Sequence, residues 1–262
     1  MYPFFNIFGF KLSAYSVMAI LGGAAVALFT YIRFRKKEND PKEIFSYLTY
    51  AFGFLVIGAM LLYQIVEFKS QVKIIPYLFK DFSFFRDNFK MGLVFYGGLY
   101  GALIGGWVYA KVNDTDIRET FMYLTPAIPL FHVFGRIGCF LSGCCHGAIS
   151  ESFGVLHPDG NYYIPVQLIE AVGDVIIFII LCIIKNKDNK YYKPIGIYLV
   201  LYGIMRFILE FYRGDEVRGF LGLLSTSQWI SIFTVPLGLY CLIIPTEKNF
   251  INKLYTPSKK KK

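Results

Sequence analysis

The strongest constraint on the fold is a series of seven long apolar runs. Hydrophobic residues make up 55% of the 262-residue chain and charged residues only 17%. Each run approaches the ~20 residues that an α-helix needs to cross ~30 Å of hydrocarbon. Because the bilayer interior holds no water to bind backbone groups, a segment that crosses it must pair these groups internally, as a helix does. The sequence therefore predicts an all-α integral membrane protein, with residues 1–262 as a single polytopic membrane domain. Its seven transmembrane helices are expected near 12–32, 44–66, 93–110, 121–143, 166–184, 195–212 and 225–244.

Lysine and arginine are concentrated in alternate loops and in the tail at Lys259–Lys262. Because basic loops stay in the cytoplasm, we expect the N-terminus outside and the C-terminus in the cytoplasm. The outer connections then lie at about 67–92 and 144–165, and the first of these is either an interfacial segment or a cap over the bundle. The net charge of +9 is split among short loops, which excludes a nucleic-acid groove and fits contact with anionic lipid.

Arg136 is the most informative charged residue, because it lies within the fourth apolar run. A charge at membrane depth costs from ~3 to more than ~10 kcal/mol, depending on the reference state, so such a residue usually faces a cavity and has a function. Gly135, Gly138 and Gly147 surround it. Residues without a side chain let backbone amides and a bulky head group come close. The pattern predicts a binding site at Arg136.

A second polar group occurs in the sixth run, at Tyr202, Arg206, Glu210 and Arg213. This spacing places the four residues on one helix face, and such a face does not point into lipid. Two interpretations stay open. An Arg206–Glu210 pair locks the bundle, or the arginines bind an anion. The second arginine favours the anion site, because one carboxylate cannot neutralise both.

Acidic residues near these arginines are expected to hold them in place. Gln167, Glu170 and Asp174 share one face of the fifth helix, and Glu67 lies at the outer end of the second. Either Glu170 or Glu67 is expected to orient Arg136. Guanidinium groups bind phosphate oxygens bidentately and stay charged where solvent is scarce, so the predicted ligand is a phospholipid phosphate.

Three cysteines, Cys139, Cys144 and Cys145, follow this arginine. Their spacing matches no common zinc pattern, so we expect no metal and no cofactor. Packing as free thiols is the favoured interpretation, while a disulfide near an oxidising outer face and a reactive thiol stay open. His146 and His132 are structural histidines or candidate bases.

Four short segments, together with Tyr15 in the first run, form a set of motifs that spans most of the chain. The segments are Gly97-Gly98-Leu99 with Gly101; Gly135-Arg136-Ile137-Gly138 with Phe140 and Gly147; Pro165 with Gln167, Leu168 and Glu170; and Tyr202-Gly203 with Arg206, Glu210, Phe211, Arg213, Leu224-Ser225 and Gln228-Trp229. Taken together and in this order, they resemble the prolipoprotein diacylglyceryl transferase family.

The resemblance implies seven spans, an outer N-terminus and a multi-pass place in the bacterial cytoplasmic membrane. It implies transfer of the diacylglyceryl group from phosphatidylglycerol to the lipobox cysteine of a prelipoprotein, with release of glycerol phosphate. Arg136 would hold the lipid phosphate, Arg206 would stabilise the departing phosphate, and Glu210 would orient Arg206. The implied substrate-binding residues are Arg136, Gly135, Gly138, Gly147, Tyr15, Gln167, Glu170, Tyr202 and Arg213.

The chain departs from the family on the side that activates the acceptor thiol. Tyr96 stands where the family usually has a histidine, and a tyrosine pKa near ~10 makes it a poorer base than a histidine near ~6.5. Cys139 and Cys144 replace the asparagine and glutamate of the family's signature. Tyr96 is still expected at the site, and two alternatives stay open: a relative that uses phospholipid with another acceptor, and a non-enzymatic phospholipid-binding or transport bundle.

Overall fold

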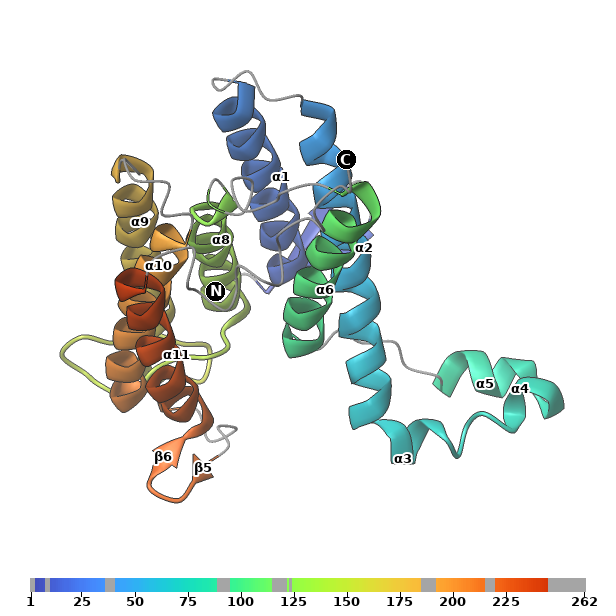
Figure 1. Ribbon diagram of the computed structural model, residues 1–262. Helices are drawn as coiled ribbons and strands as arrows, with labels where there is room; N and C mark the ends of the chain where they lie inside the picture. Colours follow the sequence, from blue (N-terminus) through green and yellow to red (C-terminus); the bar gives the residue numbers. More distant parts are fainter. Residues whose placement is uncertain are drawn as a thin grey trace. The chain divides into compact units, whose positions relative to one another are not determined.

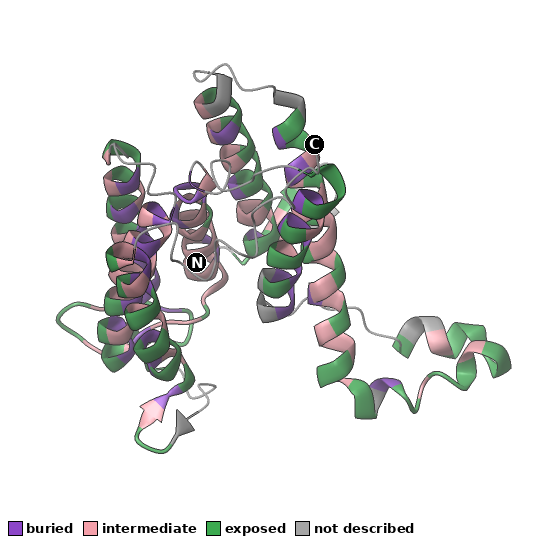
Figure 2. Cartoon of the chain, in the orientation of Figure 1, coloured by how far each residue is buried: buried purple, intermediate pink, exposed green. Residues whose placement is uncertain are grey.

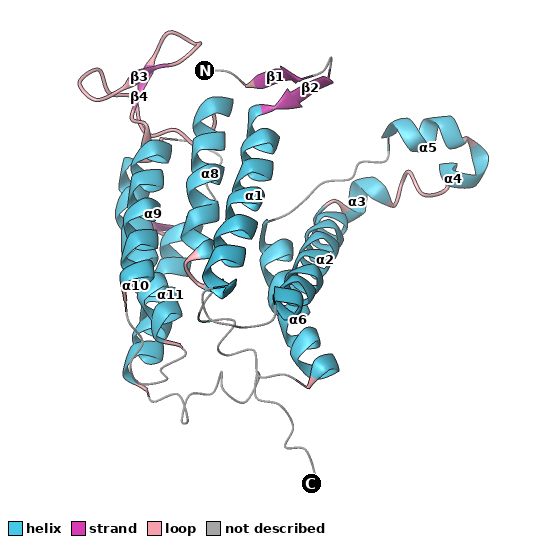
Figure 3. Cartoon of the chain, turned by 90° about the horizontal axis from the view of Figure 1, so that it is seen from above, coloured by secondary structure: helices cyan, strands magenta, loops and turns pink. Residues whose placement is uncertain are grey.

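The fold comprises two compact units, formed by residues 1–38 with 118–252 and by residues 39–117 with 253–262. The computed structural model describes residues 3–7, 10–35, 41–88, 95–114, 122, 124–184, 192–214 and 220–244. Helices dominate both units (Figure 3).

The first unit is a row of helices, each packed on the next, and Figure 1 shows α8 to α11 side by side. Ile177 and Leu181 of α9 and Tyr198 of α10 form its buried apolar core. The helices in order are α1 (Ala14–Arg35), α8 (Ala127–Ser142), α9 (Val166–Ile183), α10 (Lys193–Leu209) and α11 (Thr226–Ile243).

The ends of these helices follow from local sequence. Gly143 ends α8 with a φ of 74°, a left-handed conformation that glycine adopts without steric cost. Ser225 and Gln228 form a reciprocal capping box at the start of α11, which satisfies amides that the first helical turn leaves unpaired. After α10, the chain makes a single 3-10 turn, η1 (Glu210–Tyr212), and then becomes extended at Arg213.

Three short antiparallel hairpins lie at one end of this unit, and the all-α prediction omitted them. The first precedes α1 and the second connects α8 to α9 (Figure 3), and the third precedes α11 (Figure 1). Their strands are too short to show the period-two pattern by which strands are recognised. The hairpins are β1 (Phe4–Ile7) with β2 (Phe10–Ser13), β3 (Val155–Leu156) with β4 (Tyr162–Tyr163), and β5 (Phe220–Leu221) with β6 (Leu224–Ser225).

The second unit is built on a close helix pair, α2 (Pro41–Val66) and α6 (Phe95–Asn113). A Cβ atom at Gly97 would collide with the carbonyl oxygen of Gly58, and one at Gly101 would collide with that of Phe54. Gly97, Gly101 and Gly105 recur at four-residue intervals and form a small-residue ridge on α6 that packs against α2.

The predicted outer connection at 67–92 contains three short helices, α3 (Phe68–Gln71), α4 (Tyr77–Lys80) and α5 (Phe82–Asn88). Phe79 and Phe82 are exposed on them. Aromatic side chains exposed among charged ones fit either an interfacial segment or a cap.

Five of the described helices, α1, α2, α9, α10 with η1, and α11, are long and apolar enough to cross a membrane. The predicted spans at 93–110 and 121–143 correspond to α6 and to α8, which is a shorter apolar helix of 16 residues. Large apolar side chains such as Phe52, Ile183 and Phe233 are exposed on the helices, and Figure 2 shows exposed residues along the helices of both units. Apolar surface on this scale is unusual for a soluble monomer and fits helices that face lipid.

The glycine contact predicts the effect of one added methyl group. Gly101→Ala should destabilise the α2–α6 pair by ~1–3 kcal/mol, because backbone atoms of α2 fill the space of the new side chain. Gly53→Ala, also in this pair, is the matched control, since its Cβ would have no neighbour within 4 Å. Thermal unfolding in detergent measures both, and equal melting temperatures would contradict the packing argument.

Candidate active site

The site is centred on Glu170, which is 1% exposed on α9. Its Oε1 lies 2.8 Å from Nη2 of Arg136 on α8 and accepts a hydrogen bond of 3.2 Å from the Tyr202 hydroxyl on α10. Glu170 thus ties three helices together. The sequence left Glu170 and Glu67 as alternative partners for Arg136. The structure shows the contact with Glu170, and Glu67 belongs to the second unit.

Arg206 on α10 approaches the same carboxylate from the other side. Its Nη1 lies 3.8 Å from Oε2 of Glu170, and its Nη2 lies 2.9 Å from Oε2 of Glu210 and donates a 3.1 Å hydrogen bond to Oγ of Ser227. Nη1 is buried and donates no hydrogen bond to the described residues. A buried donor that makes no hydrogen bond is costly, so Nη1, beside Glu170, has the capacity to donate to a further acceptor.

The ratio of carboxylates to arginines in this cluster differs from the one that the sequence-based argument assumed. That argument set one carboxylate, Glu210, against Arg206 and Arg213. In the structure Arg206 contacts two carboxylates, Glu210 and Glu170, and Glu170 also contacts Arg136. The structure therefore contains the Arg206–Glu210 pair that one of the two interpretations predicted. The two carboxylates hold the guanidinium groups in place at a depth where a lone cation would be costly.

Glycines fix the backbone around Arg136. A Cβ at Gly138 would lie 3.3 Å from the Cα of Tyr15, so this glycine lets α1 approach α8 and places Tyr15 next to the arginine's helix. A Cβ at Gly135 would meet no atom within 4 Å. Gly135 therefore borders open space, while Gly138 is a packing contact.

The loop after α8 is held against the ends of α9 and α10. Nε2 of Gln167 donates a 2.6 Å hydrogen bond to the carbonyl oxygen of Cys144. Gly147 forms a β-bridge with Arg213, and a Cβ at Gly147 would lie 2.7 Å from the Tyr212 oxygen. The predicted single face that included Arg213 is wrong in this detail, because the helix ends before that residue.

His132 lies one turn before Arg136, beside Asp174. Its Nδ1 is 3.9 Å from Oδ1 of Asp174 and 3.4 Å from the Tyr198 hydroxyl. Asp174 is fully buried, and neither of its carboxylate oxygens accepts a hydrogen bond from the described residues. This second polar cluster lies beside the Glu170 cluster, since the His132 ring is 5.1 Å from the Tyr202 ring.

His146 lies in a separate aromatic group with His157 and Tyr163. Its ring centroid is 5.0 Å from that of His157 and 4.0 Å from that of Tyr163, and its Nδ1 is 3.1 Å from the Gly147 carbonyl oxygen. Burial lowers the pKa of His157, and the neighbouring His146 lowers it further. Of the two candidate bases, His132 lies among polar groups beside the Glu170 cluster, whereas His146 lies in an aromatic group at the loop.

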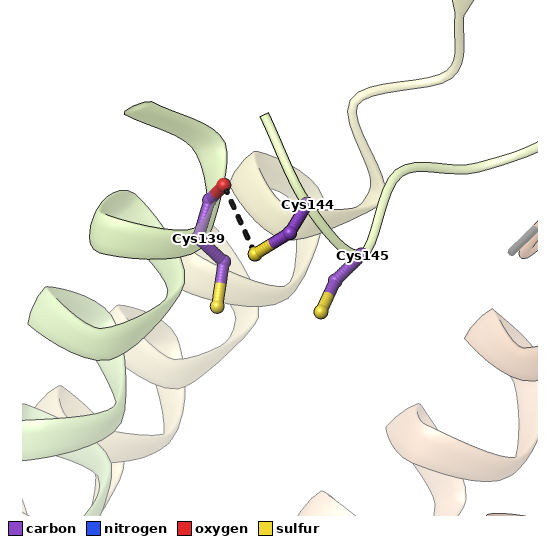
Figure 4. Close-up of side chains that lie close together, drawn as sticks. All are labelled: Cys139, Cys144 and Cys145. Atoms are coloured by element: carbon purple, nitrogen blue, oxygen red, sulfur yellow. Dashed lines mark hydrogen bonds between the residues drawn. The ribbon is translucent and has the colours of Figure 1, made fainter. Parts of the chain in front are cut away.

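Cys139, Cys144 and Cys145 lie together at the end of α8 (Figure 4). None of the five cysteines of the chain, all of which the structure describes, forms a disulfide bond. Cys144 Sγ lies 3.6 Å from the Cys139 carbonyl oxygen, which is the contact drawn in Figure 4.

Tyr96 is the sequence-predicted site residue that lies outside the first unit. It belongs to the second unit, at the start of α6, and its side chain is outside the described residues. Ser227 contacts Arg206 but was not predicted. It is one of several hydroxyl residues at the start of α11, and no local pattern distinguishes it from the others.

Comparison with known proteins assigns the family. The family model described as prolipoprotein diacylglyceryl transferase matches residues 3–244. A phosphatidylglycerol–prolipoprotein diacylglyceryl transferase of Clostridium tetani is 32% identical over 243 residues, covering 90% of this chain and 94% of the relative. Similarly named relatives are 33% identical in Clostridium perfringens, covering 89% and 91%, and 29% identical in Helicobacter pylori, covering 95% of each chain. The chain belongs to the prolipoprotein diacylglyceryl transferase family.

Proposed function

We propose that this chain is a transferase that moves the diacylglyceryl group of phosphatidylglycerol to the lipobox cysteine thiol of a prelipoprotein. The observation that carries the proposal is that Arg136 and Arg206 both contact Glu170, while the buried Nη1 of Arg206 donates no hydrogen bond to the described residues. A phosphate oxygen would supply an acceptor. The relatives named for this reaction match nearly the whole chain.

In the reaction, the acceptor sulfur bonds to the glyceryl carbon of the lipid, and the bond from that carbon to the phosphate oxygen breaks. The electron pair leaves with glycerol phosphate, and the thiol proton passes to a base. Negative charge therefore grows on the phosphate, where preorganised cations lower the barrier most. Arg136 and Arg206 hold that phosphate, and Glu170, Tyr202, Glu210 and Ser227 position the two guanidinium groups.

The remaining substrate contacts follow from the same geometry. Open space at Gly135 gives room for the lipid beside Arg136. Three further proposed contacts lie on α1, on α9 and just after η1, and each packs on α8 or on the loop that follows it: Tyr15, Gln167 and Arg213. Gly138 and Gly147 act by permitting the close packing that forms it.

The topology proposed for the enzyme adds α6 and α8 to the five long apolar helices, giving seven spans in a single polytopic domain. Basic loops place the N-terminus outside and the C-terminus in the cytoplasm. A multi-pass enzyme in the bacterial cytoplasmic membrane would then open its site to the outer leaflet. Tyr96 is assigned to this site by its sequence position alone.

Loss of the Arg136 guanidinium should abolish most of the transfer. Arg136→Ala should lower the rate roughly 10²–10³-fold, because one preorganised charge is lost from the transition state, and Arg136→Lys should restore little, since lysine lacks the bidentate fork. Purified protein in detergent, acyl-labelled phosphatidylglycerol and a lipobox peptide give the readout, which is a gain of one diacylglyceryl group in peptide mass.

Arg33→Ala is the control, because Arg33 lies at the opposite end of α1 from Tyr15. A folded Arg136→Ala protein with wild-type transfer would overturn the anion site. Consumption of the lipid without a gain in peptide mass would mean that the acceptor is a different molecule. Lipid that stays intact would contradict the proposal that the chain is an enzyme.

The contact with Ser227 predicts a smaller effect. Ser227→Ala removes one hydrogen bond to the Arg206 guanidinium, which is worth ~1.5–3 kcal/mol for a charged partner, so the transfer rate should fall by at least about tenfold. Ser231→Ala is the matched control, because Ser231 is buried one turn later and its hydroxyl donates to the Ser227 carbonyl oxygen. Similar rates for the two variants would show that Ser227 does not position Arg206.

The base for the acceptor thiol is either His132 or His146. Replacing the base with glutamine should lower transfer at pH 7, and the deficit should shrink as the pH rises towards ~8.5, where a thiol ionises without help. His132→Gln and His146→Gln are compared in the peptide assay between pH 6 and pH 9, with His157→Gln as the control. A uniform deficit at every pH would mean a structural role.

A further inference from the structure

The three thiols at the end of α8 come closer together than their sequence spacing predicted. The sulfur atoms of Cys139, Cys144 and Cys145 all lie within 4.8 Å of one another, and Figure 4 shows all three sulfurs on neighbouring side chains. Small movements of the side chains would bring the sulfurs to metal-binding distances, because three sulfurs bound at ~2.3 Å around one ion are about 4 Å apart.

The backbone explains how two adjacent cysteines reach the same place. Successive side chains of an extended segment point to opposite faces, which makes a pair such as Cys144 and Cys145 a poor chelate. Here Gly143 has a φ of 74° and Cys145 a φ of 60°. A left-handed residue other than glycine is uncommon, and this one turns the Cys145 side chain back towards the end of α8.

The three sulfur donors favour one class of metal ion. In the part of the chain that the structure describes, no histidine nitrogen or carboxylate oxygen joins the three sulfurs in this group. A structural zinc ion needs four protein ligands, whereas soft thiolates favour monovalent copper. Arg213 and Arg136 act electrostatically on Cys145, so they would offset the negative charge of a trithiolate centre.

We propose that Cys139, Cys144 and Cys145 form a binding site for a soft, thiophilic metal ion, with monovalent copper held by three sulfurs. Three thiolates and one such ion carry a net charge of −2. A loaded centre would therefore add negative charge beside Arg136. If the proposed transferase function holds, loading should weaken the binding of the lipid phosphate.

The test uses the purified, reduced full-length protein in detergent, titrated anaerobically with Cu⁺ in competition with the chelator bicinchoninate. The wild type should withhold one equivalent from the chelator, and Cys139→Ser and Cys145→Ser should each lose it. A Cys182→Ser, Cys241→Ser double variant is the matched control and should keep it, because those cysteines lie outside the cluster. An X-ray absorption spectrum of the loaded wild type should show a coordination shell of sulfur alone.

No withheld copper, or equal amounts withheld by the wild type and by folded Cys139→Ser and Cys145→Ser, would overturn the site. Retention of Zn²⁺ in place of Cu⁺ would overturn the three-sulfur assignment. A disulfide that persists under the reducing conditions and prevents binding would overturn it as well.

The peptide transfer assay separates this site from the enzyme. With limiting phosphatidylglycerol, one equivalent of Cu⁺ should lower the transfer rate of the wild type and of the double control. A protein that transfers lipid normally but binds no copper would contradict only the proposed metal site. A protein that binds copper but transfers no lipid would contradict only the proposed transferase function.

Discussion

The contact on which the site depends is the buried carboxylate of Glu170 between two guanidinium groups. Arg136 and Arg206 come from different helices, and each would be costly in an apolar bundle without a counter-charge. Glu170 contacts both, and Glu210 contacts Arg206 on its far side. This arrangement keeps two cations at depth and leaves one of their donors available for a ligand.

That carboxylate can act only because three helices present their polar faces to one another. α8, α9 and α10 pack in sequence, and the Tyr202 hydroxyl completes the link to Glu170. The loop after α8 is fastened to the same region by Gln167 and by the Gly147–Arg213 bridge. These described contacts all lie within the first unit, and each links a polar group to a second element.

Much of this arrangement could be predicted from the sequence. Apolar runs marked the helices, and the spacing of Gln167, Glu170 and Asp174 marked a buried face that the structure confirms. The glycine ridge at Gly97 and Gly101 was also visible, because small residues at four-residue intervals permit one kind of helix contact. Local periodicity carries this information, since it determines which face of a helix is buried before any partner is known.

The tertiary structure decided which polar residues meet. Sequence spacing could not choose between Glu170 and Glu67, could not identify Ser227 as a partner of Arg206, and placed Arg213 on a helix that ends before it. It also made adjacent cysteines a poor metal site, until a left-handed Cys145 turned their sulfurs together. Sequence alone determined a membrane-embedded helical chain with arginines at depth, because transfer free energy depends on composition. Which charges pair depends on distances between helices, and only the packed fold determines those.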